Sequence, residues 1–171
     1  MPEPRGLTFI LGGARSGKSA HAEALVAAFP APWFYIATAQ AFDGEMEERI
    51  ALHRQRRGEA WVTVDAPLDL AGALRVAPEG QPVLVDCLTL WLSNHLLASH
   101  DLEGVCGELE GVLGSPRGPW FVVSNEVGLG IVPDNRLARQ FRDAAGRLNQ
   151  RIAARADAML LMVAGLPLKV K

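Results

Sequence analysis

The strongest constraint on the fold lies in residues 9–25, FILGGARSGKSAHAEAL, where an apolar run meets a glycine pair and a helix-like segment follows. Gly12 and Gly17 allow backbone angles that residues with a Cβ resist, so successive N–H groups can turn toward one anion. The spacing Gly12-x-x-x-x-Gly17-Lys18-Ser19 is that of the phosphate-binding loop between a strand and a helix. A chance glycine turn is the alternative, but the flanking strand and helix are the context that the motif requires. The stretch therefore predicts a nucleoside triphosphate site.

Each part of this loop has an expected role. The loop backbone and the positive end of the following helix would surround the phosphates. Lys18 would reach the β- and γ-phosphates, and the Ser19 hydroxyl would bind Mg²⁺. The predicted loop residues are Gly12, Gly13, Ala14, Arg15, Ser16, Gly17, Lys18 and Ser19.

Apolar runs alternate with helix-like segments along the 171 residues. This alternation predicts an α/β fold, a mostly parallel sheet with helices on both faces. Strands are expected at residues 7–11, 33–37, 62–64, 83–86, 120–124 and 159–163. Helices are expected at residues 19–28, 43–55, 68–77, 88–97, 102–113 and 135–156. We find no repeat or linker, so residues 1–171 are expected to form one domain, with LPLKVK at the end as a lysine-bearing edge strand.

Composition narrows the function classes. The net charge of −2 and the few aromatic residues argue against nucleic-acid binding. Two cysteines cannot form a disulfide framework, and Cys87, in an apolar run, is expected to be a small buried hydrophobe. The first residues are broken too early for a signal peptide or a membrane span. The cytosol is the simplest compartment.

A second candidate lies in PVLVDCLTLW (82–91), an apolar strand that ends in Asp86. A carboxylate at the carboxyl end of a strand beside the phosphate loop is where an aspartate holds Mg²⁺. Aspartate is also a favoured helix N-cap, here before Leu88, and the two roles can coexist.

The segment FDGEMEERIALHRQRRGEAW (42–61) displays a histidine on a helix. Met46, Ile50 and His53 share one helical face, and arginines follow the histidine within residues 54–57. Such a histidine is often structural and such arginines often form a solvated face, but arginines also suit phosphates and a neutral imidazole is a competent nucleophile. Spacing alone leaves both interpretations open.

A third feature is VVSNEVGLGIVPDNRLARQF (122–141), where a strand leads into a glycine-rich apolar loop. The loop would lie at the sheet edge where α/β proteins bind ligands. Glu126 could position a substrate or a metal-bound water, or only order the loop. Asp134 or Asn135 would cap the arginine-bearing helix that follows. The other histidines show no metal-like spacing and are expected to pack or lie on the surface: His21, His95 and His100.

Several blocks together resemble the bifunctional adenosylcobinamide kinase / adenosylcobinamide-phosphate guanylyltransferase family. They are GGARSGKSAHAE, YIATAQAFDGEMEERIALHRQRR, LVDCLTLWLSN, NEVGLGIVPDNRLARQFRDAAGRLNQ and LKVK. The resemblance runs nearly end to end in the same order, and NEVGLGIVP and the His-Arg helix are more specific than the phosphate loop.

The resemblance implies a RecA-like P-loop fold and two reactions of adenosylcobalamin biosynthesis. ATP or GTP would phosphorylate the aminopropanol hydroxyl of adenosylcobinamide. GTP would then form a covalent His–GMP intermediate, releasing pyrophosphate, and the GMP would pass to adenosylcobinamide phosphate to give adenosylcobinamide-GDP. The family resemblance also suggests a homotrimer.

Carried over by position, His53 is the guanylylated residue, and Lys18 serves both reactions. The nucleotide site would also include Ala37, Thr38, Ala39, Arg54, Gln55, Arg56, Arg57, Asp65 and Asp86. This chain has Gly58 and Asp65 where the family has proline and glutamate, so the contact of the shorter Asp65 with guanine or ribose is direct or passes through a water. Some relatives carry adjacent histidines at the nucleophile position, but here Leu52 precedes His53.

Two other functions stay open on the residues alone. One is a small-molecule kinase without guanylyltransferase activity, in which His53 only packs or binds substrate. The other is a RecA-like nucleotide-driven switch or assembly ATPase, whose loop after Glu126 would contact a partner. Covalent labelling by GTP separates the first from the bifunctional enzyme, and turnover without a small-molecule acceptor would favour the second.

Overall fold

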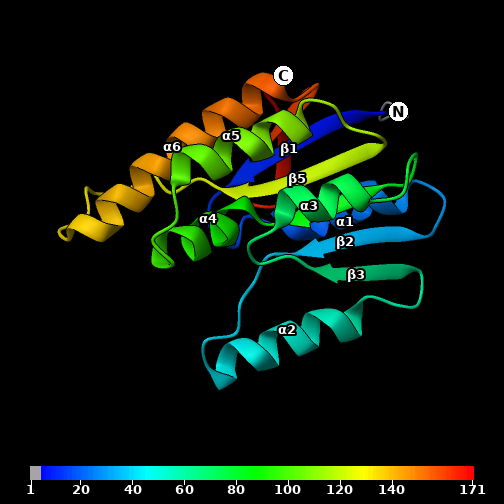
Figure 1. Cartoon of the computed structure of the whole chain (residues 1–171). Coiled ribbons are helices and arrows are strands. Elements are labelled where there is room, and N and C mark those ends of the chain that lie inside the picture. Colours follow the sequence, from blue (N-terminus) through cyan, green and yellow to red (C-terminus); the bar gives the residue numbers. More distant parts are fainter. Residues whose placement is uncertain (1–4) are drawn as a thin grey trace.

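A seven-stranded sheet organises the computed structural model, which describes residues 5–171, and its strand order is β3-β2-β4-β5-β1-β6-β7 (Figure 1). Every neighbouring pair is parallel except β6 and β7. The strands are β1 (Gly6–Gly12), β2 (Trp33–Ala37), β3 (Trp61–Asp65), β4 (Val83–Asp86), β5 (Pro119–Asn125), β6 (Ala158–Val163) and β7 (Leu166–Lys169).

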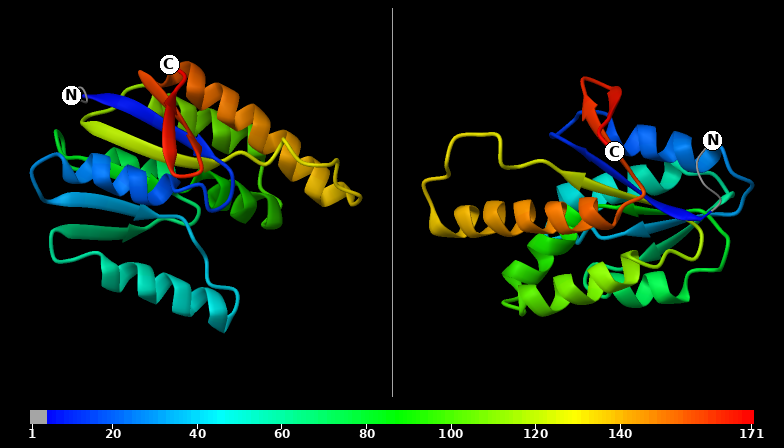
Figure 2. Two further views of the ribbon diagram at one scale, coloured as in Figure 1. Left: turned by 180° about the vertical axis from the view of Figure 1, so that it is seen from behind. Right: turned by 90° about the horizontal axis from the view of Figure 1, so that it is seen from above.

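Helices cover both faces of the sheet, but unequally. Figure 2 shows α1 on one face and α3 to α6 on the other. The helices are α1 (Lys18–Ala27), α2 (Gly44–Arg56), α3 (Leu70–Val76), α4 (Leu88–Leu97), α5 (Leu102–Leu113) and α6 (Arg136–Arg155). Within the described part of the chain, no helix is both long and apolar enough to cross a membrane.

The alternating sides of the strands explain the two cores. Phe9 of β1 faces the core under α3 to α6, whereas Ile10 faces the smaller core under α1. Both side chains are fully buried, as expected of a strand with neighbours on each side. Helix α2 differs from the other helices: it lies beyond the β3 edge of the sheet and buries none of its residues (Figure 1).

The predicted fold class is confirmed, and every expected strand and helix is present, with bounds that shift by up to two residues. The closing edge strand is confirmed as β7, which pairs with β6. Asp86 ends β4, as predicted. Strand β5 lies between β1 and β4, so its own carboxyl end, Asn125, enters the space between them.

Buried polar side chains hold the loops at the carboxyl ends of the strands. The Asn94 side chain donates to the Thr38 carbonyl oxygen at 2.8 Å and to that of Pro67 at 2.9 Å. One residue of α4 thereby fixes the loops that follow β2 and β3. The long helix α6 is tied in similarly, because Asn149 accepts from the Ser124 hydroxyl at 2.7 Å.

We expect Asn94→Ala to lower the free energy of unfolding by about 1–3 kcal/mol, because two carbonyl oxygens lose their donor. Urea denaturation measures this change. Leu97→Ala on the same helix is the matched control, since Leu97 is 58% exposed and its truncation should change stability by less than about 0.5 kcal/mol. Equal losses in the two variants would contradict a linking role for Asn94.

Candidate active site

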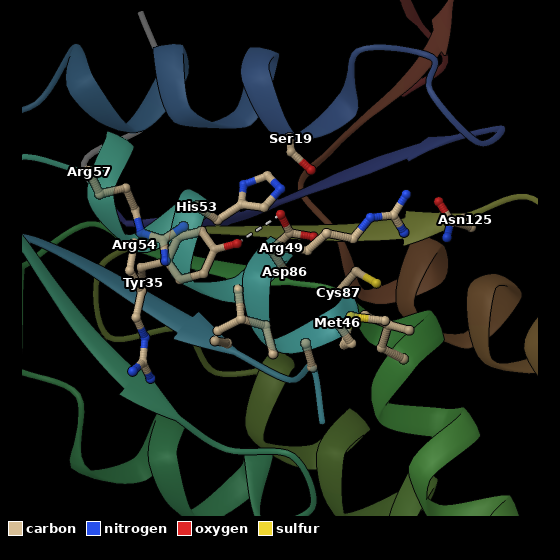
Figure 3. Close-up of a pocket in the computed structure, with 14 residues that line it drawn as sticks. Ser19, Tyr35, Met46, Arg49, His53, Arg54, Arg57, Asp86, Cys87 and Asn125 are labelled. Atoms are coloured by element: carbon tan, nitrogen blue, oxygen red, sulfur yellow. Dashed lines mark hydrogen bonds between the residues drawn. The ribbon is translucent and has the colours of Figure 1, made fainter. Parts of the chain in front are cut away.

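A cavity of about 440 Å³ lies at the carboxyl ends of the parallel strands (Figure 3). The ends of β2, β4 and β5 meet α1 and α2 there, which is where α/β sheets place ligands. Its lining residues are Ser19, Tyr35, Ala37, Ala39, Met46, Arg49, Ile50, His53, Arg54, Arg57, Asp86, Cys87, Leu90 and Asn125.

The phosphate loop joins β1 to α1 beside this cavity. Gly17 precedes α1 with φ +92°, a backbone conformation that favours glycine. A Cβ at Gly12 would approach the Met162 carbonyl oxygen at 2.9 Å, so the loop also needs glycine there for close packing against β6. The loop residue that reaches the cavity lining is Ser19.

Lys18 places a buried cation at the start of α1. Its side chain is 7% exposed, and Nζ donates to the Gly13 carbonyl oxygen at 2.6 Å. Burial lowers the pKa of Lys18, while nearby Cys87 and Asp86 act in the opposite direction. A carbonyl oxygen satisfies one N–H of the ammonium but supplies no counter-charge. The site therefore favours an anion.

Asp86 ends β4 and faces the same cavity. Its Oδ2 accepts a hydrogen bond from the Tyr35 hydroxyl at 3.0 Å. The N-cap interpretation of Asp86 is wrong, because Cys87 occupies the N-cap position of α4 and makes no side-chain cap hydrogen bond. Cys87 is buried as expected, and burial raises the pKa of its thiol to about 11, so it stays protonated at neutral pH.

Helix α2 presents His53 to this cavity. The Asp43 side chain caps the helix by accepting from the Met46 N–H at 2.9 Å. Met46, Ile50 and His53 all line the cavity, which confirms that they share one face. Figure 3 shows His53 projecting into the space that Ser19 and Asp86 also line.

The arginines after His53 differ in their contacts. Arg57 lies over the Tyr35 ring, with its Cζ 3.5 Å from the ring centroid. Its Nε and Nη1 are buried and have no hydrogen-bond partner among residues 5–171. Arg54 forms an ion pair with Asp65, whose carboxylate therefore already has a cationic partner. Arg54 and Arg57 line the cavity, which Asp65 does not.

The remaining predicted residues lie beside the cavity lining or outside it. Ala37 and Ala39 line it, but the Thr38 hydroxyl between them donates to the Cys87 carbonyl oxygen at 2.7 Å and accepts from the Cys87 N–H at 2.8 Å. Thr38 thus joins β2 to the end of β4. Gln55 and Arg56 are exposed and absent from the lining. Loop residues 12–18 are also absent from the lining.

Sequence analysis missed several residues of this region. Tyr35, Arg49 and Asn125 line the cavity, and Glu23 of α1 lies close enough to influence it electrostatically. Burial raises the pKa of Glu23, and the positive charge of Arg57 opposes this. Glu23 follows Ser19 by four residues, and this helical spacing could have predicted that both face the same side of α1. No sequence pattern predicted the contacts of Tyr35 with Asp86 and Arg57.

Glu126 begins the apolar loop that follows β5. Its N–H donates to the Gly12 carbonyl oxygen at 2.9 Å, and its carboxylate accepts from the Gly128 N–H at 2.5 Å. This is the loop-ordering contact that the sequence allowed. Further along, Leu129 and Ile131 are 90% and 97% exposed. Asn135 caps α6 by accepting from the Ala138 N–H, as one of the two predicted caps.

The fold and the loop define a P-loop nucleotide-binding α/β protein of the RecA-like kind. Two solved structures are similar to it in fold alone. One is a prototypical ATPase from the type III secretion system of pathogenic bacteria (TM-score 0.54, 12% identity, 96% of this chain and 56% of that chain). The other is a protein from Pyrococcus horikoshii OT3 (TM-score 0.56, 9% identity, 97% and 86%).

Sequence comparison defines the family. Residues 8–170 match the model of the cobinamide kinase / cobinamide phosphate guanyltransferase family, and the chain belongs to it. It is 52% identical over 166 residues to the bifunctional adenosylcobalamin biosynthesis protein CobP of Pseudomonas aeruginosa, covering 95% of each chain. It is 42% identical over 182 residues to CobU of Salmonella typhimurium, covering 96% of this chain and 99% of the relative.

We expect Lys18→Met to suppress nucleotide turnover without lowering the melting temperature. The substitution removes a buried charge and keeps much of the side-chain volume. The protein without bound nucleotide should therefore be no less stable to unfolding. Losing one preorganised contact to a transferring phosphate commonly costs about 10²–10³ in rate. Steady-state kinetics and thermal unfolding of the purified variant measure the two effects. A lower melting temperature with normal rates per folded molecule would make Lys18 a structural residue.

Asp86→Asn tests the carboxylate while keeping its shape. The amide oxygen can still accept from Tyr35, so we expect the fold to persist and the Mg²⁺ concentration for half-maximal turnover to rise. A magnesium titration of the initial rate measures this shift. An unchanged titration curve would contradict a metal-binding role for Asp86.

Proposed function

We propose that this chain catalyses both reactions of its family and that His53 is the residue that becomes guanylylated. The observation that carries the proposal is the cavity itself. His53 comes from α2, Ser19 from the phosphate loop and Asp86 from β4, and all three line one cavity. A histidine so placed can meet a nucleotide held by the loop.

In the first reaction, the phosphate loop would hold the triphosphate of ATP or GTP. The hydroxyl of adenosylcobinamide would attack the γ-phosphorus, and the bond from that phosphorus to the β–γ bridging oxygen would break. The Lys18 ammonium stabilises the charge that accumulates on the phosphates. His53 forms no bond in this step, because the substrate supplies its own nucleophile.

In the second reaction, a ring nitrogen of His53 would attack the α-phosphorus of GTP. The bond from that phosphorus to the α–β bridging oxygen breaks, pyrophosphate leaves, and a phosphoramidate remains on the ring. A phosphate oxygen of adenosylcobinamide phosphate would then attack the same phosphorus. The P–N bond breaks, which gives adenosylcobinamide-GDP and restores His53. The arginines that line the cavity suit the phosphate groups of both substrates.

Ser19 and Asp86 would hold Mg²⁺ together with the nucleotide phosphates. Among residues 5–171, no group of three or more histidines, cysteines, aspartates or glutamates could hold a metal on its own. Ser19 and Asp86 fit Mg²⁺, which usually binds through one or two carboxylates and substrate phosphates. When bound, the ion would neutralise charge on the phosphate oxygens.

The proposal extends to the setting of the enzyme. We propose a homotrimer in the cytosol, as the family resemblance suggests, with adenosylcobinamide and its phosphate as substrates. Exposed apolar side chains in the loop after Glu126, such as Leu129 and Ile131, support contact with another molecule.

His53→Asn separates the two reactions. We expect it to abolish covalent labelling by [α-³²P]GTP and the formation of adenosylcobinamide-GDP, because both need the ring nitrogen. Kinase activity should remain measurable. In the unsubstituted protein, the adduct should be acid-labile and alkali-stable, as a phosphoramidate is, and should map to the peptide around His53.

His21→Asn is the control, since His21 does not line the cavity. This variant should still be labelled by [α-³²P]GTP. An adduct retained in His53→Asn would identify another nucleophile. No adduct in the unsubstituted protein, alongside an active kinase, would leave a kinase without guanylyltransferase activity. Nucleotide turnover without a corrinoid acceptor, and without phosphorylation of one, would favour a switch or assembly ATPase.

A further inference from the structure

Tyr35 of β2 links two charged residues that come from distant parts of the chain. Its hydroxyl donates to Oδ2 of Asp86 at 3.0 Å. Its ring supports the guanidinium of Arg57, whose Cζ lies 3.5 Å from the ring centroid. Only 6% of Tyr35 is exposed, so the surrounding structure fixes its position. One side chain thus contacts both the end of β4 and the end of α2 (Figure 3).

Helix α2 depends on such a contact because it buries no residue of its own. Arg57 is the C-cap of this helix, one turn beyond His53. Among the described residues, one ion pair and one cation–π stack join this end of α2 to the sheet: Arg54 with Asp65, and Arg57 on Tyr35. An exposed ion pair contributes little to holding two segments together, whereas a cation packed on a buried aromatic ring contributes more.

The two contacts use only part of each partner. Stacking uses the face of the Arg57 guanidinium, and its buried Nε and Nη1 have no hydrogen-bond partner among residues 5–171. The Tyr35 hydroxyl is the donor in its hydrogen bond to Asp86. Asp86 keeps its other carboxylate oxygen.

We propose that Tyr35 is a positioning residue that keeps the His53 helix aligned with Asp86 and the phosphate loop. This inference rests on the proposed function, in which His53 attacks the nucleotide. In this inference Tyr35 acts through Asp86 and Arg57, the two residues that it contacts. Its hydroxyl positions Asp86, which would act in both reactions. Its ring positions Arg57 and thereby α2, which matters for the reaction that uses His53.

Two substitutions separate these contacts. Tyr35→Phe removes the hydroxyl and keeps the ring under Arg57, whereas Tyr35→Leu removes both. Trp61→Phe is the matched control, because Trp61 packs against Tyr35 (ring centroids 6.1 Å apart) but does not line the cavity. The measurements are the single-turnover rate of His53 labelling by [α-³²P]GTP, the kinase rate and the Mg²⁺ dependence of each, all per folded molecule.

Tyr35→Phe should slow both reactions by a similar factor and raise the Mg²⁺ concentration for half-maximal rate. Tyr35→Leu should slow His53 labelling by about 10–10²-fold more than it slows the kinase, because misplacing a nucleophile by about 1 Å can cost about 10²-fold. Trp61→Phe should keep the ratio of the two rates and the Mg²⁺ dependence of the unsubstituted protein.

An unchanged ratio of labelling to kinase rate in Tyr35→Leu, with normal labelling in the unsubstituted protein, would overturn this inference and leave the proposed function intact. No labelling in the unsubstituted protein would overturn the proposed function, and this inference with it. If Tyr35→Leu does not fold, Arg57→Lys provides the same test, since it keeps the charge but loses the planar group that stacks on the ring. It should lower the ratio, and an unchanged ratio would overturn the inference.

Discussion

The burial of the Lys18 ammonium is the constraint on which the site depends. A buried cation at the start of a helix is unfavourable unless an anion or fixed dipoles compensate its charge. Here the Gly13 carbonyl oxygen provides one hydrogen bond, and the turned loop leaves its N–H groups for an anion. Gly12 and Gly17 make this turn possible because they pack against the backbone of Met162 and Gly165. The hairpin of β6 and β7 therefore packs against the phosphate loop and supports it.

The parallel strand order then brings the other polar groups to that loop. Strand β5 enters between β1 and β4, so Asn125 reaches the cavity together with Asp86. Buried amides on the covering helices hold the connecting loops in place, with Asn94 bound to the loops after β2 and β3. These bonds satisfy carbonyl oxygens that would otherwise be buried without partners. The sheet half of the site is therefore rigid.

Helix α2 forms the other half of the site and is attached differently. It carries His53 but buries none of its residues, and its far end is joined to the sheet through Arg54 and Arg57. A segment with few buried contacts is drawn from the less stable part of a fold. Under the proposed function, this arrangement suits two reactions at one nucleotide site, because the phosphate loop would act in both and His53 in only one.

The sequence by itself determined the features that depend on neighbouring residues. Glycine spacing fixed the phosphate loop, and helical periodicity put Met46 and His53 on one face, because both follow from local backbone geometry. Pairings between distant segments were decided only by the tertiary structure. The place of β5 between β1 and β4, the stack of Arg57 on Tyr35 and the pairing of Asp65 with Arg54 needed the strand order and the packing of α2, which no local pattern encodes. An aromatic residue in a strand and an arginine after a helix each have many possible partners, and only the assembled core selects one.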